Sequence, residues 1–69
     1  MNIFATRLKE LRQEKGFTLN AVSKLLGCPL TTYANYEQGK REPSLFMLNL
    51  LCDVYDVTSD YLIGRTDSY

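Results

Sequence analysis

Residues 30–38 combine hydrogen-bonding and small apolar side chains on one face of an expected helix. At helical spacing this face carries Leu30, Thr31, Ala34, Asn35 and Gln38. Amide and hydroxyl groups can pair with the edges of DNA bases, and small apolar groups can touch the methyl group of thymine. Two cations, Lys40 and Arg41, follow directly and carry the charge that attracts phosphate groups. The chemistry that this stretch predicts is the reading of base edges beside a phosphate clamp.

The opposite face of the same helix is expected to point into the protein. Tyr33, Tyr36 and Glu37 recur at spacings of three and four residues. A carboxylate that points inward needs a charged partner, because an unpaired buried charge is strongly destabilising. We therefore expect a cation from another helix beside Glu37.

Catalytic and metal-binding arrangements are not visible in the chain. It has no histidine, and its two cysteines are Cys28 and Cys52. A structural zinc site takes about four Cys or His ligands, so we expect no metal. Both cysteines lie on apolar faces of helical patterns, where thiols act as small buried hydrophobes. The carboxylates are scattered and no phosphate-binding glycine loop is present, so we expect neither an enzyme nor a cofactor.

Charge is balanced in total and divided along the chain. Residues 1–41 carry seven cations and three carboxylates, whereas residues 42–69 carry one cation and five carboxylates. A half with net charge +4 therefore precedes a half with net charge −4. The first half could meet a polyanion that the second would repel. An accidental gradient across an ordinary surface is the alternative, which charge alone leaves open.

The length of 69 residues fits one domain. A domain this small buries only about 60% of its unfolded surface, so a second subunit would help to stabilise it. The longest apolar run is far shorter than the roughly 20 residues of a membrane span. Residues 1–4 have neither the basic nor the apolar region of a signal peptide. The expected location is the cytoplasm.

Five helical patterns, with no competing strand pattern, predict an all-α domain. Their expected limits are, in order, Phe4 to Gly16, a cap at Thr18 to Gly27, Pro29 to Gln38, a cap at Ser44 to Tyr55, and a cap at Thr58 to about Gly64. Core positions expected in the second and fourth helices are Val22, Leu25, Leu26, Leu45, Leu48, Leu51, Cys52 and Tyr55. The predicted domain covers residues 1–65, and residues 66–69 form a short polar tail.

The second and third patterns are joined by about three residues that include Gly27. A connection this short makes the two helices cross steeply, as in a helix-turn-helix unit, here over about residues 18–38.

These features together resemble the Cro and phage-repressor type of helix-turn-helix domain, the XRE-like family. The segments that carry the resemblance are "RLKELRQEKGFT", "LLGCPLTTYANYEQGKREPSL" and "VYDVTSDYLIG", and the similarity covers residues 4–65. The resemblance implies a five-helix, lambda-repressor-like bundle that binds double-stranded operator DNA as a dimer and regulates transcription as a repressor. The operator would be pseudo-palindromic.

The resemblance also assigns roles to individual residues. The recognition helix, about residues 29–38, would lie in the major groove, with Leu30, Thr31, Ala34, Asn35 and Gln38 facing the bases. The residues expected to contact phosphate are Thr18, Asn20, Lys40 and Arg41. Arg12 and Glu37 would form an internal ion pair between the first and third helices, which agrees with the inward position of Glu37.

Three departures from the family pattern bear on affinity. Leu19 stands where glutamine is usual, and Pro29 stands where a serine or threonine cap is usual. The recognition helix contains no arginine or lysine. Without an arginine to meet guanine, we expect this helix to favour half-sites that contain A·T pairs.

The fourth helix has more apolar residues than one core-facing stripe needs. The surplus is Phe46, Leu50 and Val54, and Tyr61 on the fifth helix adds to it. Small monomers rarely expose such a stripe, so we expect these four residues to form the interface of a homodimer. A thicker core within one protomer is the alternative.

A rival function is a protein-interaction module built on the same scaffold, with weak DNA binding or none. The neutral net charge and the uncharged recognition helix fit that alternative.

Overall fold

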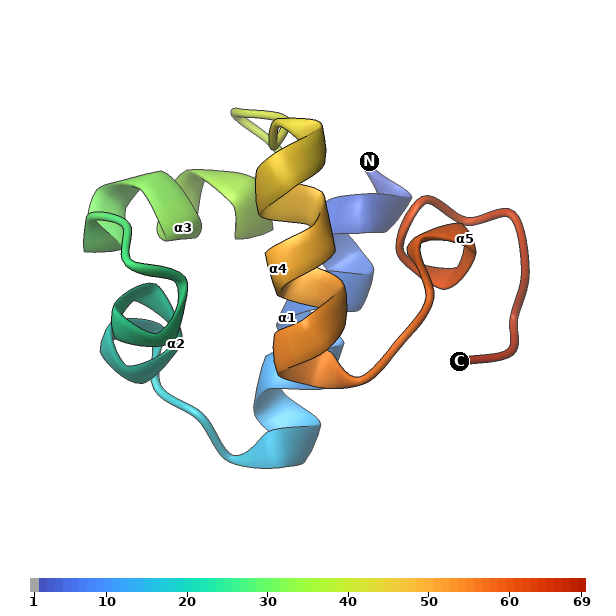
Figure 1. Ribbon diagram of the computed structural model, residues 1–69, viewed down its shortest axis with the longest axis horizontal. Helices are drawn as coiled ribbons and strands as arrows, with labels where there is room; N and C mark the ends of the chain where they lie inside the picture. The colour runs from blue at the N-terminus through green and yellow to red at the C-terminus, as the bar shows by residue number, and fades with distance from the viewer. Residues whose placement is uncertain (1) are drawn as a thin grey trace.

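The computed structural model describes residues 2–69, and Met1, where the expected domain begins, lies outside them. Within the described residues the chain forms five helices and no strand (Figure 1). The helices are α1 (Ile3–Lys15), α2 (Leu19–Leu26), α3 (Leu30–Glu37), α4 (Leu45–Tyr55) and α5 (Ser59–Leu62). The predicted all-α, five-helix fold is confirmed. α5 is a single turn and is shorter than the sequence pattern indicated.

Side-chain caps begin four of the five helices. The caps expected at Thr18, Ser44 and Thr58 each accept a hydrogen bond from a backbone N–H in the first turn. Asn2 caps α1 in the same way, accepting from the N–H of Phe4 at 2.9 Å. Such caps satisfy donors that would otherwise have no partner inside the helix. Pro29 precedes α3 and offers no side-chain cap.

Two glycines end the first two helices in a left-handed backbone conformation. Gly16 has φ 72° and Gly27 has φ 71°, values that residues with a Cβ rarely adopt. α3 ends at Glu37, one residue earlier than expected, and Gln38 lies in a right-handed conformation before Gly39. The predicted helix ends at Gly16 and Gly27 are confirmed.

The core lies where α1 and α4 meet the other three helices. α1 packs against α3 and α5, and α4 packs against α2 and α5, with α2 and α3 on one side of the bundle and α5 on the other (Figure 1). Side chains with no exposed surface include Leu8, Val22, Tyr33, Leu51 and Leu62, one from each helix. Burying each aliphatic side chain of this set contributes about 1.5–3 kcal/mol.

Two leucines that were expected in the core lie at the surface instead. Leu25 is 61% exposed, because α2 buries the face that carries Val22 and Leu26 and the neighbouring position turns outward. Leu45 is 81% exposed at the first residue of α4, where the helix extends beyond its neighbours (Figure 1). The expectation that both residues belong to the core was wrong.

Residues 66–69, expected to be a polar tail, pack against α1 and α5. The guanidinium of Arg7 donates to the backbone carbonyls of Tyr61 and Thr66. It also lies 4.2 Å from the centre of the Tyr61 ring. The ring of Tyr69 meets the same ring edge to face, with centroids 4.8 Å apart. This segment is therefore held by α1 through Arg7 and through Glu14, whose carboxylate accepts a hydrogen bond from the Tyr69 hydroxyl at 3.1 Å.

A buried pair of tyrosine hydroxyls joins α3 to α4. The hydroxyl oxygens of Tyr33 and Tyr55 lie 2.6 Å apart, and both side chains are almost fully buried. Burial raises the pKa of Tyr33, and the nearby Glu37 carboxylate raises it further. Burial likewise raises the pKa of Tyr55, to about 12. Both rings are thus favoured in their protonated form.

The fold should lose stability in strong alkali because of this pair. An unfolded tyrosine ionises near pH 10. Since the folded pKa of Tyr55 is raised to about 12, the stabilising contribution is complete below pH 10 and is lost as the pH rises toward 12. Circular dichroism across pH 8–12 should show this loss. A double variant, Tyr33→Phe with Tyr55→Phe, should lose less stability over the same range; equal losses would contradict the assignment.

Candidate nucleic-acid interface

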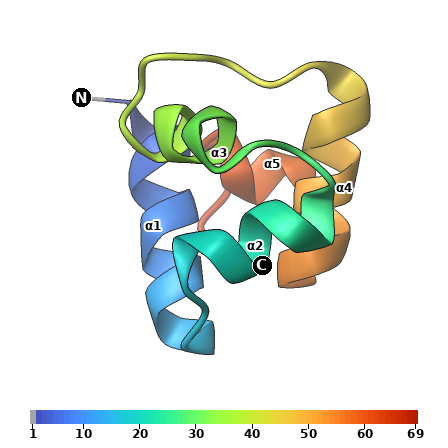
Figure 2. The ribbon, with the colours of Figure 1, turned by 90° about the vertical axis from the view of Figure 1, so that its left-hand side faces the viewer.

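A tight turn sets α2 and α3 at a steep angle. Gly27 ends α2 in its left-handed conformation, and the N–H of Cys28 donates to the carbonyl of Ser23 at 3.0 Å. In Figure 1 α2 is seen nearly end-on while α3 lies across the view, and Figure 2 shows the reverse. The predicted helix-turn-helix geometry is therefore present, and α3 lies at the edge of the bundle.

α3 has one buried face and one accessible face. Tyr33 and Tyr36 are buried in the core. On the other side, Leu30, Thr31 and Gln38 are exposed, and Ala34 and Asn35 are half-buried. The five side chains expected to face DNA bases thus all reach the surface, four from α3 and Gln38 from the position directly after it. This arrangement is what a helix needs in order to meet a groove with one face while the protein holds the other.

A bidentate ion pair fixes α3 against α1. Arg12 Nε donates to Glu37 Oε2 at 2.7 Å, and Arg12 Nη2 donates to Glu37 Oε1 at 3.2 Å. The Glu37 side chain is only 6% exposed. The hydrogen bond to Glu37 raises the pKa of Arg12, although partial burial opposes that change. A third bond, from Arg12 Nη1 to the carbonyl of Phe17, ties the loop before α2 to the same guanidinium.

The two residues expected to contact phosphate near α2, its cap Thr18 and Asn20 in its first turn, lie exposed. Thr18 accepts from the N–H of Ala21 at 3.0 Å, which leaves its hydroxyl proton available to another acceptor. Asn20 is exposed in the first turn. Leu19 lies between them in sequence, half-buried and packed against the core. Leucine thus supplies packing where a glutamine would supply an amide.

Two cations stand exposed in the loop after α3. Lys40 and Arg41 are exposed, and neither takes part in the ion pairs formed within residues 2–69. The N–H of Lys40 donates to the carbonyl of Asn35 at 2.9 Å, so the loop is folded back onto the end of α3. This bond keeps the cationic corner next to the accessible face of α3.

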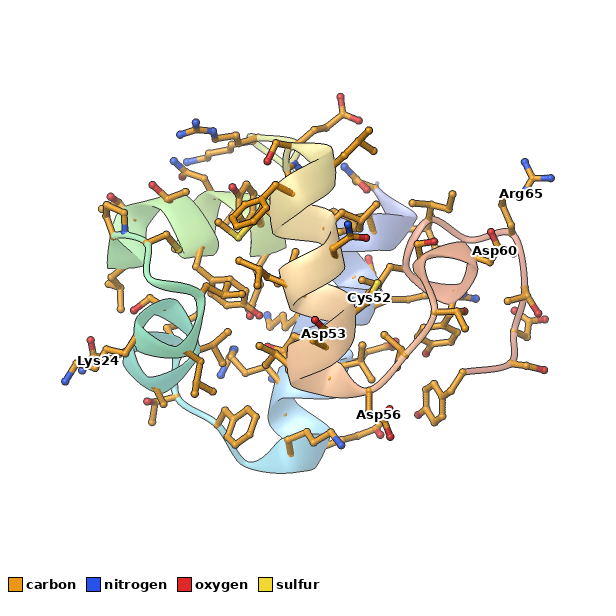
Figure 3. All side chains as sticks on the ribbon, in the orientation of Figure 1. Lys24, Cys52, Asp53, Asp56, Asp60 and Arg65 are labelled. Carbon is orange, nitrogen blue, oxygen red and sulfur yellow. The ribbon has the colours of Figure 1, made fainter. Side chains whose placement is uncertain are left out.

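Three acidic residues of the second half lie away from this corner, whereas the exposed Glu42 directly follows Arg41. Figure 3 shows Asp53 on α4, Asp56 just after α4 and Asp60 on α5, whereas Lys24 projects from the outer side of α2. The charge division seen in the sequence is therefore only partly a division in space, since Arg7 of the first half also pairs with Asp67 of the second at 2.8 Å. A polyanion that approached α3 would meet little acidic charge from α4 and α5.

An apolar surface remains on α4. Phe46 is 72% exposed, and Leu50 and Val54 are half-buried. Tyr61, which was expected in the same surface, is only 9% exposed because Arg7 and Tyr69 cover its ring. That placement corrects the expectation for Tyr61, which belongs to the packing of the protomer.

Neither cysteine has the environment of a reactive thiol. Cys28 and Cys52 are both half-buried against the core, and both are free. Burial raises the pKa of each thiol, which disfavours the reactive thiolate. Among residues 2–69, no group of three or more His, Cys, Asp or Glu side chains is placed to hold a metal ion. No helix in that range has both the length and the apolar character to cross a membrane.

A family comparison identifies this fold. The model of the helix-turn-helix family matches residues 8–62, which is most of the chain. The chain belongs to the Cro and phage-repressor type of helix-turn-helix family. The family resemblance inferred from the sequence is therefore confirmed.

Individual relatives and structures agree with the family match. The chain is 49% identical over 59 residues to the HTH-type transcriptional regulator AnsR of Bacillus subtilis, covering 86% of this chain and 51% of AnsR. It is 30% identical to the uncharacterised regulator YazB of the same organism, covering 87% of each. The structure resembles the restriction-modification controller protein C.AhdI of Aeromonas hydrophila, with TM-score 0.79, 30% identity, and coverage of 86% and 89%. The chain spans about half the length of AnsR.

The ion pair that holds α3 should be essential to the fold. Arg12→Met would leave the Glu37 carboxylate buried without a partner, at a cost of roughly 3 kcal/mol in the free energy of unfolding. Urea denaturation should show a lower midpoint, and the double variant Arg12→Met with Glu37→Leu should recover most of it. Lys15→Met, on the same helix at an exposed site, is the matched control. An unchanged midpoint for Arg12→Met would contradict this role.

Proposed function

We propose that this protein binds double-stranded DNA in a sequence-specific manner and regulates transcription, with α3 in the major groove. The observation that carries the proposal is the division of α3. Tyr33 and Tyr36 anchor one face, and the opposite face presents amide, hydroxyl and small apolar groups. Family membership and relatives that are named transcriptional regulators support it. Because bacterial DNA lies in the cytoplasm, the proposed site of action is there.

Each accessible residue of α3 has a proposed partner in the groove. The Asn35 amide suits the two hydrogen-bonding atoms of adenine, and Thr31 suits a base edge or a thymine methyl. Leu30 and Ala34 present apolar groups to thymine methyls. Gln38, at the end of the accessible face, completes the set. Since no cation stands on this face, A·T-containing half-sites are favoured over guanine-rich ones.

Phosphate contacts position the helix without reading sequence. Lys40 and Arg41 would hold the strand beside the end of α3, since both are exposed and have no ion-pair partner within residues 2–69. Thr18 and Asn20 would hold a strand at the start of α2, where positive partial charge from the helix dipole favours an anion. Repression is the simplest outcome, because a protein held on a promoter excludes others.

The proposed assembly is a homodimer through α4. Phe46, in the first turn of α4, is the most exposed of the three apolar residues, and Leu50 and Val54 continue the surface along the helix. One protomer is 28 Å long, so two copies side by side can place their α3 helices about 34 Å apart, one turn of DNA. Two-fold symmetry in the protein would then be matched by a pseudo-palindromic operator.

A second candidate function is a protein-interaction module with weak DNA binding or none. The exposed leucines at the α2–α3 turn favour it, since Leu25 and Leu30 are 61% and 43% exposed. An apolar corner of this kind can bind a protein partner as readily as a groove.

Selection of bound duplexes from a random pool tests the main proposal. We expect symmetric sites with A·T-containing half-sites about one turn apart. On the selected site, neutralising the clamp with Lys40→Gln and Arg41→Gln should flatten the slope of log affinity against log salt by roughly 1.8, which is two phosphate contacts. Sequence preference should be unchanged. A pool with no enriched duplex would favour the protein-interaction alternative, and an altered preference at the same slope would contradict the clamp.

The dimer can be tested with two exposed apolar residues. Phe46→Glu should place a charge in the α4 surface and yield a monomer in sedimentation equilibrium at high micromolar concentration. Leu25→Glu makes the same change at a comparably exposed residue on α2 and should leave the dimer intact. A wild-type protein that sediments as a monomer without DNA would contradict the proposed interface.

A further inference from the structure

A polar stripe on α1 lies beside the end of α3. Its members, spaced along one face of the helix, are Asn2, Thr6, Lys9 and Gln13. Together with Gln38 and Gly39 they line an open groove of about 760 Å³. One end of the groove is therefore next to the cationic loop, because Gly39 directly precedes Lys40 and Arg41. It also includes Gln38, the last side chain of the accessible face of α3.

A second, smaller groove lies on the other side of the same contact. It has a volume of about 190 Å³ and lies between α1, the start of α2, and α3. Leu19 and Ala34 line it, together with Lys9 and Gln38. Lys9 and Gln38 therefore stand on the ridge between the two grooves. Lys9, although it comes from α1, borders the face of α3 that is proposed to meet DNA.

The charges around this ridge leave Lys9 available. Lys9 is exposed and takes part in neither ion pair formed within residues 2–69. Glu37, which also lines both grooves, is neutralised by Arg12 at 2.7 Å. Glu10 is the opposing charge, since its carboxylate borders the larger groove. The larger groove is therefore bordered by one exposed cation, Lys9, and one exposed carboxylate, Glu10.

We infer that Lys9 is a further phosphate-binding residue, which contacts the DNA strand that passes the end of α3. The inference rests on the proposed function. Lysine suits the role because it is a point charge on a flexible four-carbon stem and needs no fixed geometry to meet a phosphate. The contact extends the phosphate clamp from the loop after α3 onto α1. It adds affinity without reading bases.

The expected effect follows from counterion release. Losing one phosphate contact lowers the slope of log affinity against log salt by about 0.9, which corresponds to about fivefold weaker binding at 0.15 M salt. Lys9→Gln should show that loss on the selected duplex and equally on a mixed duplex. Glu10→Gln should strengthen binding, because it removes the carboxylate that opposes the phosphate.

The matched control is Lys15→Gln. Lys15 is an exposed cation on the same helix that lines neither groove, so the slope should stay at the wild-type value. Urea midpoints of all three variants should equal the wild type, since each changed side chain is exposed. This measurement confirms that any loss of binding is not a loss of folding.

The outcomes separate this inference from the proposed function. If the wild-type protein binds no duplex in dilute buffer, the proposed function fails and the inference fails with it. If the wild type binds with a salt-dependent slope but Lys9→Gln and Lys15→Gln have equal slopes, the function stands and the role of Lys9 is overturned. A change in sequence preference in Lys9→Gln would overturn its assignment to phosphate.

Discussion

The ion pair between Arg12 and Glu37 is the constraint on which the rest of the structure depends. A single guanidinium holds the end of α3 through two hydrogen bonds and the loop before α2 through a third. Both parts of the helix-turn-helix unit are therefore fixed relative to α1 by one side chain. Charged pairs with this bidentate geometry are directional as well as attractive. These contacts orient α3 from its inward side and leave the side chains of its accessible face free.

The Tyr33–Tyr55 pair adds a second fixed point, from α4. α3 is thus held from two directions, with α1 gripping its last turn and α4 gripping its first. Polar contacts in a small core specify position better than aliphatic packing alone, because they have both direction and length. The helix proposed to read DNA is also linked through α4 to the surface proposed to form the dimer. The contacts that pack α3 into the core are consequently the same contacts that orient its accessible face.

The sequence was informative where local chemistry decides the structure. The caps at Thr18, Ser44 and Thr58, and the helix ends at Gly16 and Gly27, follow from groups within a few residues of each other. Positions that depend on distant segments were harder. Tyr61 has the pattern of a surface residue on a short helix, and only the approach of Arg7 and Tyr69 buries it. Leu45 fits a core stripe by spacing, but its side chain stays 81% exposed, whereas Met47 and Leu48 in the same turn of α4 pack against the core. The groove beside Lys9 was likewise hard to predict, because it forms between α1 and the end of α3, which are far apart in the sequence.

The contacts of Arg7 with residues 66–69 make this segment part of the folded domain. Ordering each residue of such a segment costs about 1–2 kcal/mol of backbone entropy, which the arginine contacts and the edge-to-face contact of Tyr61 with Tyr69 must offset. Shortening the chain here would not trim a loose end. It would expose the ring of Tyr61 and leave the guanidinium of Arg7 with fewer acceptors. Because Arg7 belongs to α1, the loss would also destabilise the first helix. The first helix and residues 66–69 therefore stabilise each other.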